Sequence, residues 1–217
     1  MDKITVELRN HTPLEIPLEA ESVPYQNQNP TKELLTHIVQ LGHETVIEHV
    51  VFNFRITGIS RTLLQEFVRH RIASYTVKST RYTLVKDIRN INTETDESTM
   101  LFVVPDLFKK YPHIYMFYRK HLGMCIENMI HMYNMLSDLK ENGETLDDER
   151  ITDYVKYMLP EAFRTDAFWT VNLRSLRNFL KLRSSKKAHP EIRKLAKMIE
   201  MIIREKTEYG FLLDNYF

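Results

Sequence analysis

The sequence predicts an α+β fold in which a small antiparallel or mixed sheet is combined with long helices. Two early segments, residues 3–8 and 49–57, alternate apolar and polar residues as strands do. Apolar residues at helical spacing dominate the second half, most clearly between Tyr118 and Leu136. With 217 residues, 43% of them hydrophobic and 27% charged, the chain can bury one sizeable core, and we expect a single domain over residues 1–217.

Loop and cap signals separate the first two strands. The segment from Tyr25 to Pro30 is polar and predicts a loop. Thr31 is suited to cap a helix over residues 32–41, whose Leu and Ile residues recur at helical spacing, and Gly42 suits the end of that helix. These signals predict a short helix between the two strands.

The next segments continue the alternation of strand and helix. Gly58 is expected to end the second strand, and Ser60 is a suitable N-cap for a helix that runs into Arg69. Residues 77–88 are rich in residues that favour strands, which predicts a loop leading into another strand. A further short strand is expected over residues 99–104.

The remainder of the chain is predicted to be mostly helical. Pro105 and Pro112 bracket the start of a long helix, residues 145–158 and 171–183 have helical patterns, and Pro190 suits the first turn of a last helix ending near Lys206. The residues expected to form the packing seam of the long helix are Tyr118, Leu122, Cys125, Met129, Met132 and Leu136.

The basic residues are unevenly distributed although the formal net charge is only +1. Residues 61–89 contain seven basic and two acidic residues, and residues 164–204 contain eleven basic and three acidic. Two such stretches could converge on an anionic ligand, or they could be solvated helix faces. Charge alone favours solvated helix faces.

Several classes of site are excluded or disfavoured by the composition. Only five glycines are present, so neither a G-x-G-x-x-G nor a Walker A loop can be formed. His43 and His49 are six residues apart, whereas an H-E-x-x-H zinc helix needs four, and we expect no metal site. Cys125, in an apolar seam, is expected to be structural, and Phe168 and Trp169 are expected to lie in the core.

No segment resembles an export signal or a membrane span. The N-terminus lacks a basic region followed by an apolar stretch, and no apolar run is long enough to cross a bilayer. A single cysteine fits a reducing compartment. We therefore expect a cytoplasmic protein with no membrane partner.

The chemistry concentrates in one short segment. Arg69, His70 and Arg71 are consecutive, so on a helix end they would point in different directions and could serve more than one ligand. Guanidinium groups bind phosphates and carbonyl-rich rings, and imidazole can contact an aromatic cofactor. Ser79 and Arg81, if extended, would point the same way and suit a phosphomonoester.

The order Arg-His-Arg, seven residues, then Ser-x-Arg-Tyr resembles the signature of the flavin-dependent thymidylate synthases. The resemblance extends to residues 42–52 and 168–183. It implies the fold of that family and a homotetramer with shared active sites. It also implies reductive methylation of dUMP to dTMP, with methylenetetrahydrofolate as carbon donor and FAD and NADPH as reductant, without a cysteine nucleophile.

The resemblance also assigns roles to individual residues. Arg183 is expected to be catalytic, by stabilising the anion that forms when N3 of the pyrimidine loses its proton. The residues expected at the FAD are His43, Thr45, Arg69, His70, Arg71, Val77, Asn172, Arg174 and Asn178. The residues expected at dUMP are Glu66, Arg69, Lys78, Ser79, Arg81, Lys156 and Arg183.

Three positions depart from the family pattern. Glu66 stands where a Gln is common, with Gln65 beside it, and an anion near a nucleotide would need a neutralising Arg. Val77 stands where a Glu is frequent, so any contact there would come from its backbone. Lys156 replaces an Arg that helps to bind phosphate, which exchanges a bidentate fork for a point charge.

Two other functions remain open. The departures would also suit a nucleotide-binding flavoprotein of the same fold that has lost methyl transfer. A nucleic-acid-binding module could use the basic stretches, but the near-neutral net charge disfavours it, and we expect no nucleic-acid partner.

Overall fold

The structure, a computed structural model, describes residues 4–92 and 95–214, which divide into two compact units. The sheet unit is formed by residues 4–57, 63–76 and 166–214, and the helical unit by residues 58–62, 77–92 and 95–165. Lys3, the first residue of the first predicted strand, lies outside the described residues.

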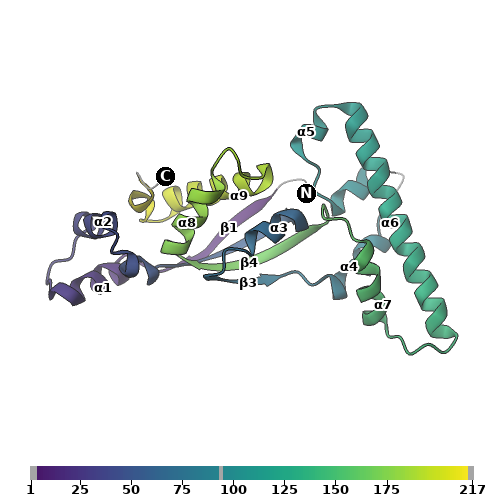
Figure 1. The fold of residues 1–217 in the computed structure, drawn as a ribbon, viewed down its shortest axis with the longest axis horizontal. Coiled ribbons are helices and arrows are strands. Elements are labelled where there is room, and N and C mark those ends of the chain that lie inside the picture. Colours follow the sequence, from purple (N-terminus) through teal and green to yellow (C-terminus); the bar gives the residue numbers. More distant parts are fainter. Residues whose placement is uncertain (1–3, 93–94, 215–217) are drawn as a thin grey trace. The chain divides into compact units, whose positions relative to one another are not determined.

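The elements are labelled in Figure 1. Those mainly in the sheet unit are β1 (Thr5–His11), α1 (Glu15–Tyr25), α2 (Lys32–Gln40), η1 (Glu44–Glu48), β2 (Val51–Ser60), α3 (Arg61–Phe67), β3 (Ala73–Val77), β4 (Arg164–Asn172), α8 (Leu173–Arg183), α9 (Pro190–Lys206) and η4 (Gly210–Leu213). Those of the helical unit are α4 (Thr80–Arg89), η2 (Asp96–Leu101), α5 (Asp106–Lys109), α6 (Pro112–Glu141), α7 (Asp148–Val155) and η3 (Lys156–Met158). This combination of helices with a small sheet confirms the predicted α+β class.

The sheet has the strand order β1-β2-β4-β3. β1 and β2 pair antiparallel, from Thr5 opposite Thr57 to His11 opposite Phe52. The prediction that Gly58 ends β2 is wrong. Gly58 takes a φ of +73°, a conformation open to glycine, and the strand continues to Ser60.

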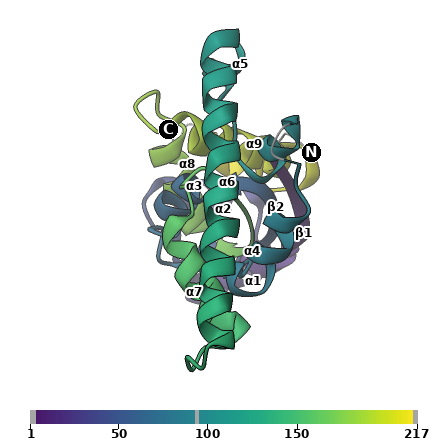
Figure 2. The ribbon, with the colours of Figure 1, turned by 90° about the vertical axis from the view of Figure 1, so that its right-hand side faces the viewer.

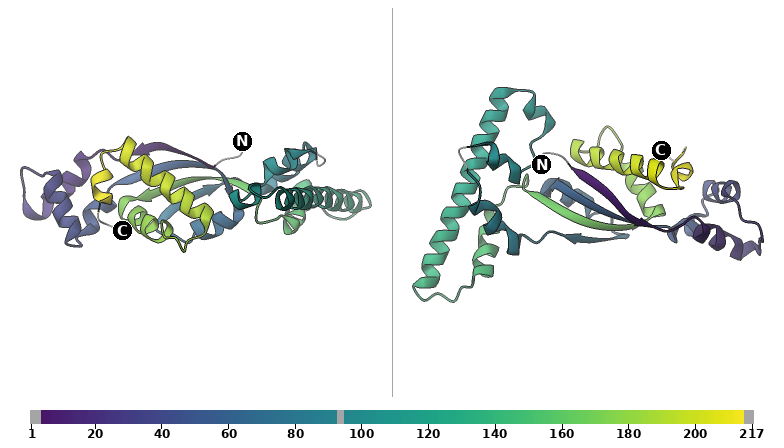
Figure 3. Two further views of the ribbon diagram at one scale, coloured as in Figure 1. Left: turned by 90° about the horizontal axis from the view of Figure 1, so that it is seen from above. Right: turned by 180° about the vertical axis from the view of Figure 1, so that it is seen from behind.

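One face of the sheet is covered by α8 and α9, as Figure 1 and both views in Figure 3 show. The alternation along β4 buries Trp169 completely beneath α8, which confirms its predicted core position. Its ring lies 5.7 Å from that of Phe54 and 5.3 Å from that of Phe179. Phe168 points to the other face and is 40% exposed, so its predicted core position is wrong.

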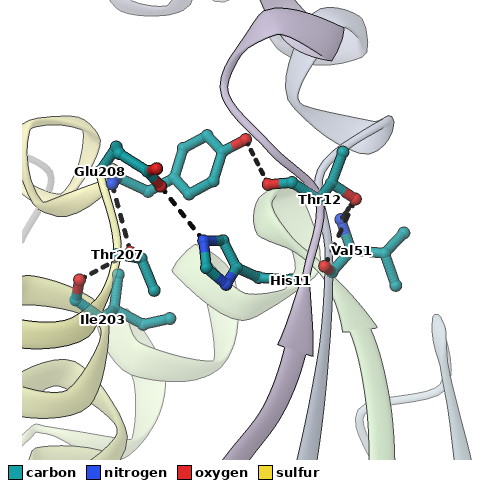
Figure 4. A network of polar contacts seen from close by, with 7 residues as sticks. His11, Thr12, Val51, Ile203, Thr207 and Glu208 are labelled. Carbon is teal, nitrogen blue, oxygen red and sulfur yellow. Dashed lines mark hydrogen bonds and ion pairs between the residues drawn. The ribbon is translucent and has the colours of Figure 1, made fainter.

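The end of α9 is fastened to the β1–β2 pair by a polar network (Figure 4). The hydroxyl of the fully buried Tyr209 donates to the carbonyl oxygen of Thr12 at 2.8 Å. His11 Nε2 lies 3.1 Å from a carboxylate oxygen of Glu208. Burial raises the pKa of the Tyr209 phenol, which keeps its hydroxyl a donor.

Three helices form the core of the helical unit. α6 packs against α4 and α7, and Figure 2 shows α6 along its length with α7 beside it. The packing face of α6 consists of Leu122, Ile126, Met129 and Tyr133. This seam partly confirms the predicted one, but Cys125 is only half-buried, and burial raises the pKa of its thiol. No helix of the described residues is long and apolar enough to cross a membrane.

Two strand predictions in this unit are wrong. Most of residues 77–88 forms helix α4, because Leu84 and Ile88, four residues apart, are fully buried against α6 and α7. Burial at helical spacing outweighs the strand preference of the Tyr and Val side chains. Residues 99–104 contain the end of η2 and one isolated bridge between Phe102 and Phe163 instead of a strand.

The helix caps follow the sequence signals closely. Thr31 Oγ1 accepts from the backbone N–H of Leu34 at 3.2 Å, as predicted for α2, and Gly42 has a φ of +91° just beyond its end. α8 and α9 occupy the predicted segments. Helix α1, which contains Pro24, was not predicted from the sequence.

A partly buried ion-pair cluster joins η1 to α8. Arg177 is only 5% exposed, and its NH1 donates to a Glu44 carboxylate oxygen at 2.6 Å. Glu44 also accepts from Arg174, at 3.3 Å, and Glu48 binds Arg174 at 2.5 Å near the surface. Glu44 is therefore the carboxylate that compensates the buried cation.

Glu44→Ala should lower the free energy of unfolding by about 2 to 3 kcal/mol, because it removes an anion from the buried Arg177. Glu48→Ala should cost clearly less, because its ion pair is exposed. Urea unfolding at one protein concentration measures both. Equal effects of the two substitutions would show that the buried Arg177 does not depend on Glu44.

Candidate functional site

The Arg69–Arg71 segment lies in the turn between α3 and β3. The hydroxyl of Tyr75 lies 3.0 Å from the carbonyl oxygen of Phe67 and 2.9 Å from that of His70, so it can donate to either. Burial raises the pKa of Tyr75 to about 12, which keeps this donor protonated. Tyr75 thus fastens the turn that presents the three basic residues.

His70 and Arg183 meet although they are far apart in sequence. Arg183 Nε donates to His70 Nε2 at 3.0 Å, and Arg183 NH1 donates to a carboxylate oxygen of Glu66 at 2.7 Å. The His70 ring also packs edge-on against Phe179 of α8, at 5.0 Å between centroids. The residue expected to be catalytic is therefore held by two residues from the region of the Arg-His-Arg motif.

The charge state of His70 follows from this geometry. Burial and the neighbouring cations Arg183 and Arg69 lower the pKa of His70 from 6.5 to about 4. A ring nitrogen that accepts from a guanidinium carries no proton itself, so Nδ1 carries the proton of the neutral ring. His70 is a neutral acceptor at physiological pH.

A cavity of about 880 Å³ opens beside these residues within the sheet unit. Its lining residues are Glu48, Arg69, His70, Arg71, Ile72, Asn172, Arg174, Ser175, Asn178, Leu182 and Arg183. It brings together all three residues of the motif and the predicted residues of α8. Most of the lining residues carry hydrogen-bond donors, and Ile72 and Leu182 add exposed apolar side chains.

The first turns of α8 fix the direction of its polar side chains. Asn172 caps the helix by accepting from the backbone N–H of Ser175 at 2.8 Å, which leaves its amide N–H groups available as donors. Arg174 and Asn178 are four residues apart and line the same cavity, as their spacing predicts. Arg174 is oriented by Glu44 and Glu48 of η1.

Three residues expected at the flavin lie outside this cavity lining. Thr45 is exposed on η1, and His43 is exposed just before that segment. Val77 is half-buried at the end of β3 and is likewise not a lining residue. Their assigned roles stay predictions.

A second cavity, of about 630 Å³, lies within the helical unit. Its lining residues are Arg81, Arg150, Asp153, Tyr154, Lys156 and Tyr157. Arg81 holds Asp153 through two nitrogens, at 3.2 and 2.5 Å, and Lys156 Nζ lies 2.5 Å from the same carboxylate. Hydrogen bonds from Arg81 and Lys156 lower the pKa of Asp153, so the carboxylate is ionised and orients both cations.

The neighbouring predicted residues are arranged differently from the expectation. Ser79 and Arg81 do not alternate in an extended segment, because Ser79 is the N-cap residue of α4 and Arg81 lies in its first turn. Lys78 Nζ is paired with Asp87 at 2.7 Å. Only Arg81 and Lys156 of the predicted nucleotide-binding residues in this unit line the cavity.

Several lining residues of the two cavities were not predicted from the sequence. In the helical unit, Arg150, Asp153, Tyr154 and Tyr157 recur at spacings of three and four along α7 and η3, a pattern that identifies one helix face. Glu48 and Ser175 lie inside segments that resemble the family, but no signal in their residue type distinguished them. Within residues 4–92 and 95–214, no group of three His, Cys, Asp or Glu side chains could hold a metal ion.

The chain is similar to known proteins over nearly its whole length. The Thy1 family model, described as "Thymidylate synthase complementing protein", matches residues 7–207. A Wolinella succinogenes protein named flavin-dependent thymidylate synthase is 35% identical over 222 residues, covering 98% of this chain and 99% of that protein. A Pyrococcus abyssi protein of the same name is 35% identical over 187 residues, covering 86% and 68%.

The fold is similar to that of a solved structure. The crystal structure of thymidylate synthase X from Helicobacter pylori, with FAD and dUMP, matches with a TM-score of 0.75 and 30% sequence identity. The match covers 99% of both chains.

The stability of the ligand-free protein should depend on pH through His70. The folded state keeps His70 neutral down to about pH 4, whereas the unfolded chain takes up a proton below about pH 6.5. The contribution of this neutral ring is fully present above pH 6.5 and is lost as pH falls to 4, by about 2 to 3 kcal/mol. The difference in unfolding free energy between wild type and His70→Gln, measured by urea titration from pH 7.5 to 4.5, should shrink accordingly. A difference independent of pH would contradict a neutral His70.

Proposed function

The chain belongs to the family of flavin-dependent thymidylate synthases, and from that premise we propose how its two cavities bind the reactants. We infer that the cavity of the sheet unit binds FAD and the pyrimidine ring of dUMP, and that the cavity of the helical unit binds the phosphate of dUMP. Each active site of the proposed homotetramer would combine residues of several subunits, so the two cavities of one chain can belong to different active sites.

The donor set of the sheet-unit cavity suits a flavin dinucleotide. A pyrophosphate and a ring with two carbonyl groups need cationic and neutral donors, which Arg69, Arg71, Arg174 and Asn178 supply. Exposed apolar side chains such as Ile72 can face the ring itself. The flavin supplies the transfer of reducing equivalents from NADPH to the one-carbon unit when it is bound.

Arg183 is the residue that we assign to the chemistry of the pyrimidine. Its side chain is only 19% exposed and its guanidinium is held by His70 and Glu66, so it enters the reaction already oriented. A fixed cation beside N3 would stabilise the negative charge that develops when N3 loses its proton, which makes C5 a better nucleophile. This fixed Arg183, beside the Arg-His-Arg turn in one cavity, is the observation that carries the proposal.

The helical-unit cavity is suited to a phosphomonoester. Arg81, Arg150 and Lys156 outweigh the single carboxylate of Asp153, which leaves a local excess of positive charge. Asp153 uses two of the five N–H donors of Arg81, so donors remain for a phosphate. Ser79, at the start of α4, is proposed as an additional donor.

The remaining reactants are proposed from the same family likeness. Methylenetetrahydrofolate would supply the carbon and NADPH the electrons, and the reaction would proceed in the cytoplasm. Cys125 has no place in this chemistry, because it lies on α6, is half-buried and has a raised thiol pKa.

The purified protein should be yellow and should form dTMP from dUMP when methylenetetrahydrofolate, FAD and NADPH are supplied. The visible spectrum and a product assay test both statements. Flavin and dUMP binding without dTMP would favour a flavoprotein that has lost methyl transfer. Absence of both flavin and product would refute the proposed function.

Arg183→Ala should abolish turnover while FAD remains bound, because the flavin donors of α8 and of the Arg-His-Arg turn are unchanged. Activity is measured by the same product assay, and flavin content by absorbance after denaturation. Lys181→Ala is the matched control, since it removes an exposed cation of α8 that does not line the cavity. Wild-type turnover by Arg183→Ala would refute the catalytic role.

Arg81→Ala should weaken dUMP binding by roughly tenfold or more, whereas binding of 2′-deoxyuridine, which lacks the phosphate, should change little. Lys156→Arg should strengthen dUMP binding, because it restores a bidentate donor. Titration of the flavin spectrum with each ligand measures these affinities. Lys140→Ala, an exposed cation paired with Asp148, is the control and should have no effect. Equal losses for dUMP and deoxyuridine would place Arg81 away from the phosphate.

A further inference from the structure

The contacts of Arg183 use more than half of its hydrogen-bonding capacity. A guanidinium group has five N–H donors. Nε donates to His70 Nε2 at 3.0 Å, NH1 donates to the Glu66 carboxylate at 2.7 Å, and NH2 donates to the Glu66 backbone oxygen at 3.3 Å. One donor on each terminal nitrogen is left for a ligand. Glu66 alone therefore engages both terminal nitrogens.

The position of Glu66 is set by the packing of α3. Phe67 and Leu63 of this helix are fully buried, which turns Glu66 toward Arg183 and leaves the neighbouring Gln65 exposed. The side chain of Glu66 is 30% exposed, and Glu66 is not among the residues that line the sheet-unit cavity. Its carboxylate is directed to Arg183, which does line that cavity.

The two side-chain acceptors of Arg183 differ in charge. His70 is a neutral acceptor, whereas the Glu66 carboxylate compensates the guanidinium charge. Without the Glu66 side chain, the guanidinium would keep His70 and the backbone oxygen of residue 66 as acceptors, but NH1 would lose its carboxylate and the group would be held less firmly. A displacement of about 1 Å at a group that must meet a reacting atom can reduce the rate by a hundredfold.

We propose that Glu66 is a positioning residue that acts through Arg183 and does not itself bind the nucleotide. It fixes the guanidinium so that its two remaining N–H donors face the pyrimidine, and its charge moderates the field that Arg183 exerts at N3. This inference rests on the proposed function of Arg183 and replaces direct nucleotide binding as the role of Glu66. A Gln at this position would keep the acceptor and remove the charge.

Kinetic measurements on Glu66→Ala, Glu66→Gln and the exposed control Gln65→Ala test the proposal. Glu66→Ala should lower kcat by roughly tenfold to hundredfold, with less than about a threefold change in KM for dUMP and an unchanged flavin spectrum. Glu66→Gln should retain kcat within about threefold, because its amide oxygen still accepts from Arg183. Its kcat–pH profile should shift to lower pH by about half a unit, because the uncompensated Arg183 stabilises the N3 anion more strongly.

A second measurement does not depend on turnover. An arginine-selective dicarbonyl reagent, followed by peptide mass spectrometry, should modify Arg183 of the flavin-loaded Glu66→Ala protein several times faster than that of the wild type or Glu66→Gln. The rate at Arg174, which is held by other carboxylates, should stay constant and serves as the internal reference.

The outcomes separate this proposal from the proposed function. If the wild type forms no dTMP but Arg183 is modified faster in Glu66→Ala, the proposed function is refuted and the positioning role is retained. An active wild type with unchanged kcat and unchanged modification in Glu66→Ala would overturn the positioning role. A loss confined to KM for dUMP in both Glu66 variants would also overturn it, since that pattern indicates direct nucleotide binding.

Discussion

The buried indole ring of Trp169 holds together the elements that carry the sheet-unit site. Its ring centroid lies 4.8 Å from that of Phe67, the last residue of α3, and 5.3 Å from that of Phe179 in α8. It also stacks on Tyr75, whose hydroxyl fastens the Arg-His-Arg turn. A displacement of this ring would therefore move both partners in the contact between His70 and Arg183.

Carboxylates bind several of the cations that line the two cavities. Glu66 binds Arg183, Glu44 and Glu48 bind Arg174, and Asp153 joins Arg81 to Lys156. Unpaired cations at this density would repel one another and would leave long side chains mobile. The carboxylates reduce that repulsion and fix the geometry, at the cost of a weaker attraction for anionic ligands.

Local signals in the sequence predicted β1, β2 and most of the helices, but they did not predict β3, β4 or α1. Thr31, Gly42 and Pro190 act through short-range geometry, so the bounds of α2 and α9 follow from neighbouring residues alone. The secondary-structure predictions were wrong where burial against distant elements decides the local structure. The segment of α4 has the composition of a strand, but Leu84 and Ile88 find their burial partners on α6 and α7, and only a helix presents both on one face.

Part of the set of residues that line the site could be predicted from the sequence, whereas the contacts between these residues could not. The spacing of Arg174 and Asn178 predicts one helix face, whereas the contact of Arg183 with Glu66 spans 117 residues and depends on how α3 and α8 pack. Which of Gln65 and Glu66 faces Arg183 could not be predicted from the sequence. Both are helical neighbours with similar volume, and only the burial of Phe67 and Leu63 decides that the carboxylate faces Arg183. Because a carboxylate compensates the guanidinium where an amide would not, this packing constraint also sets the electrostatic field that the pyrimidine would experience.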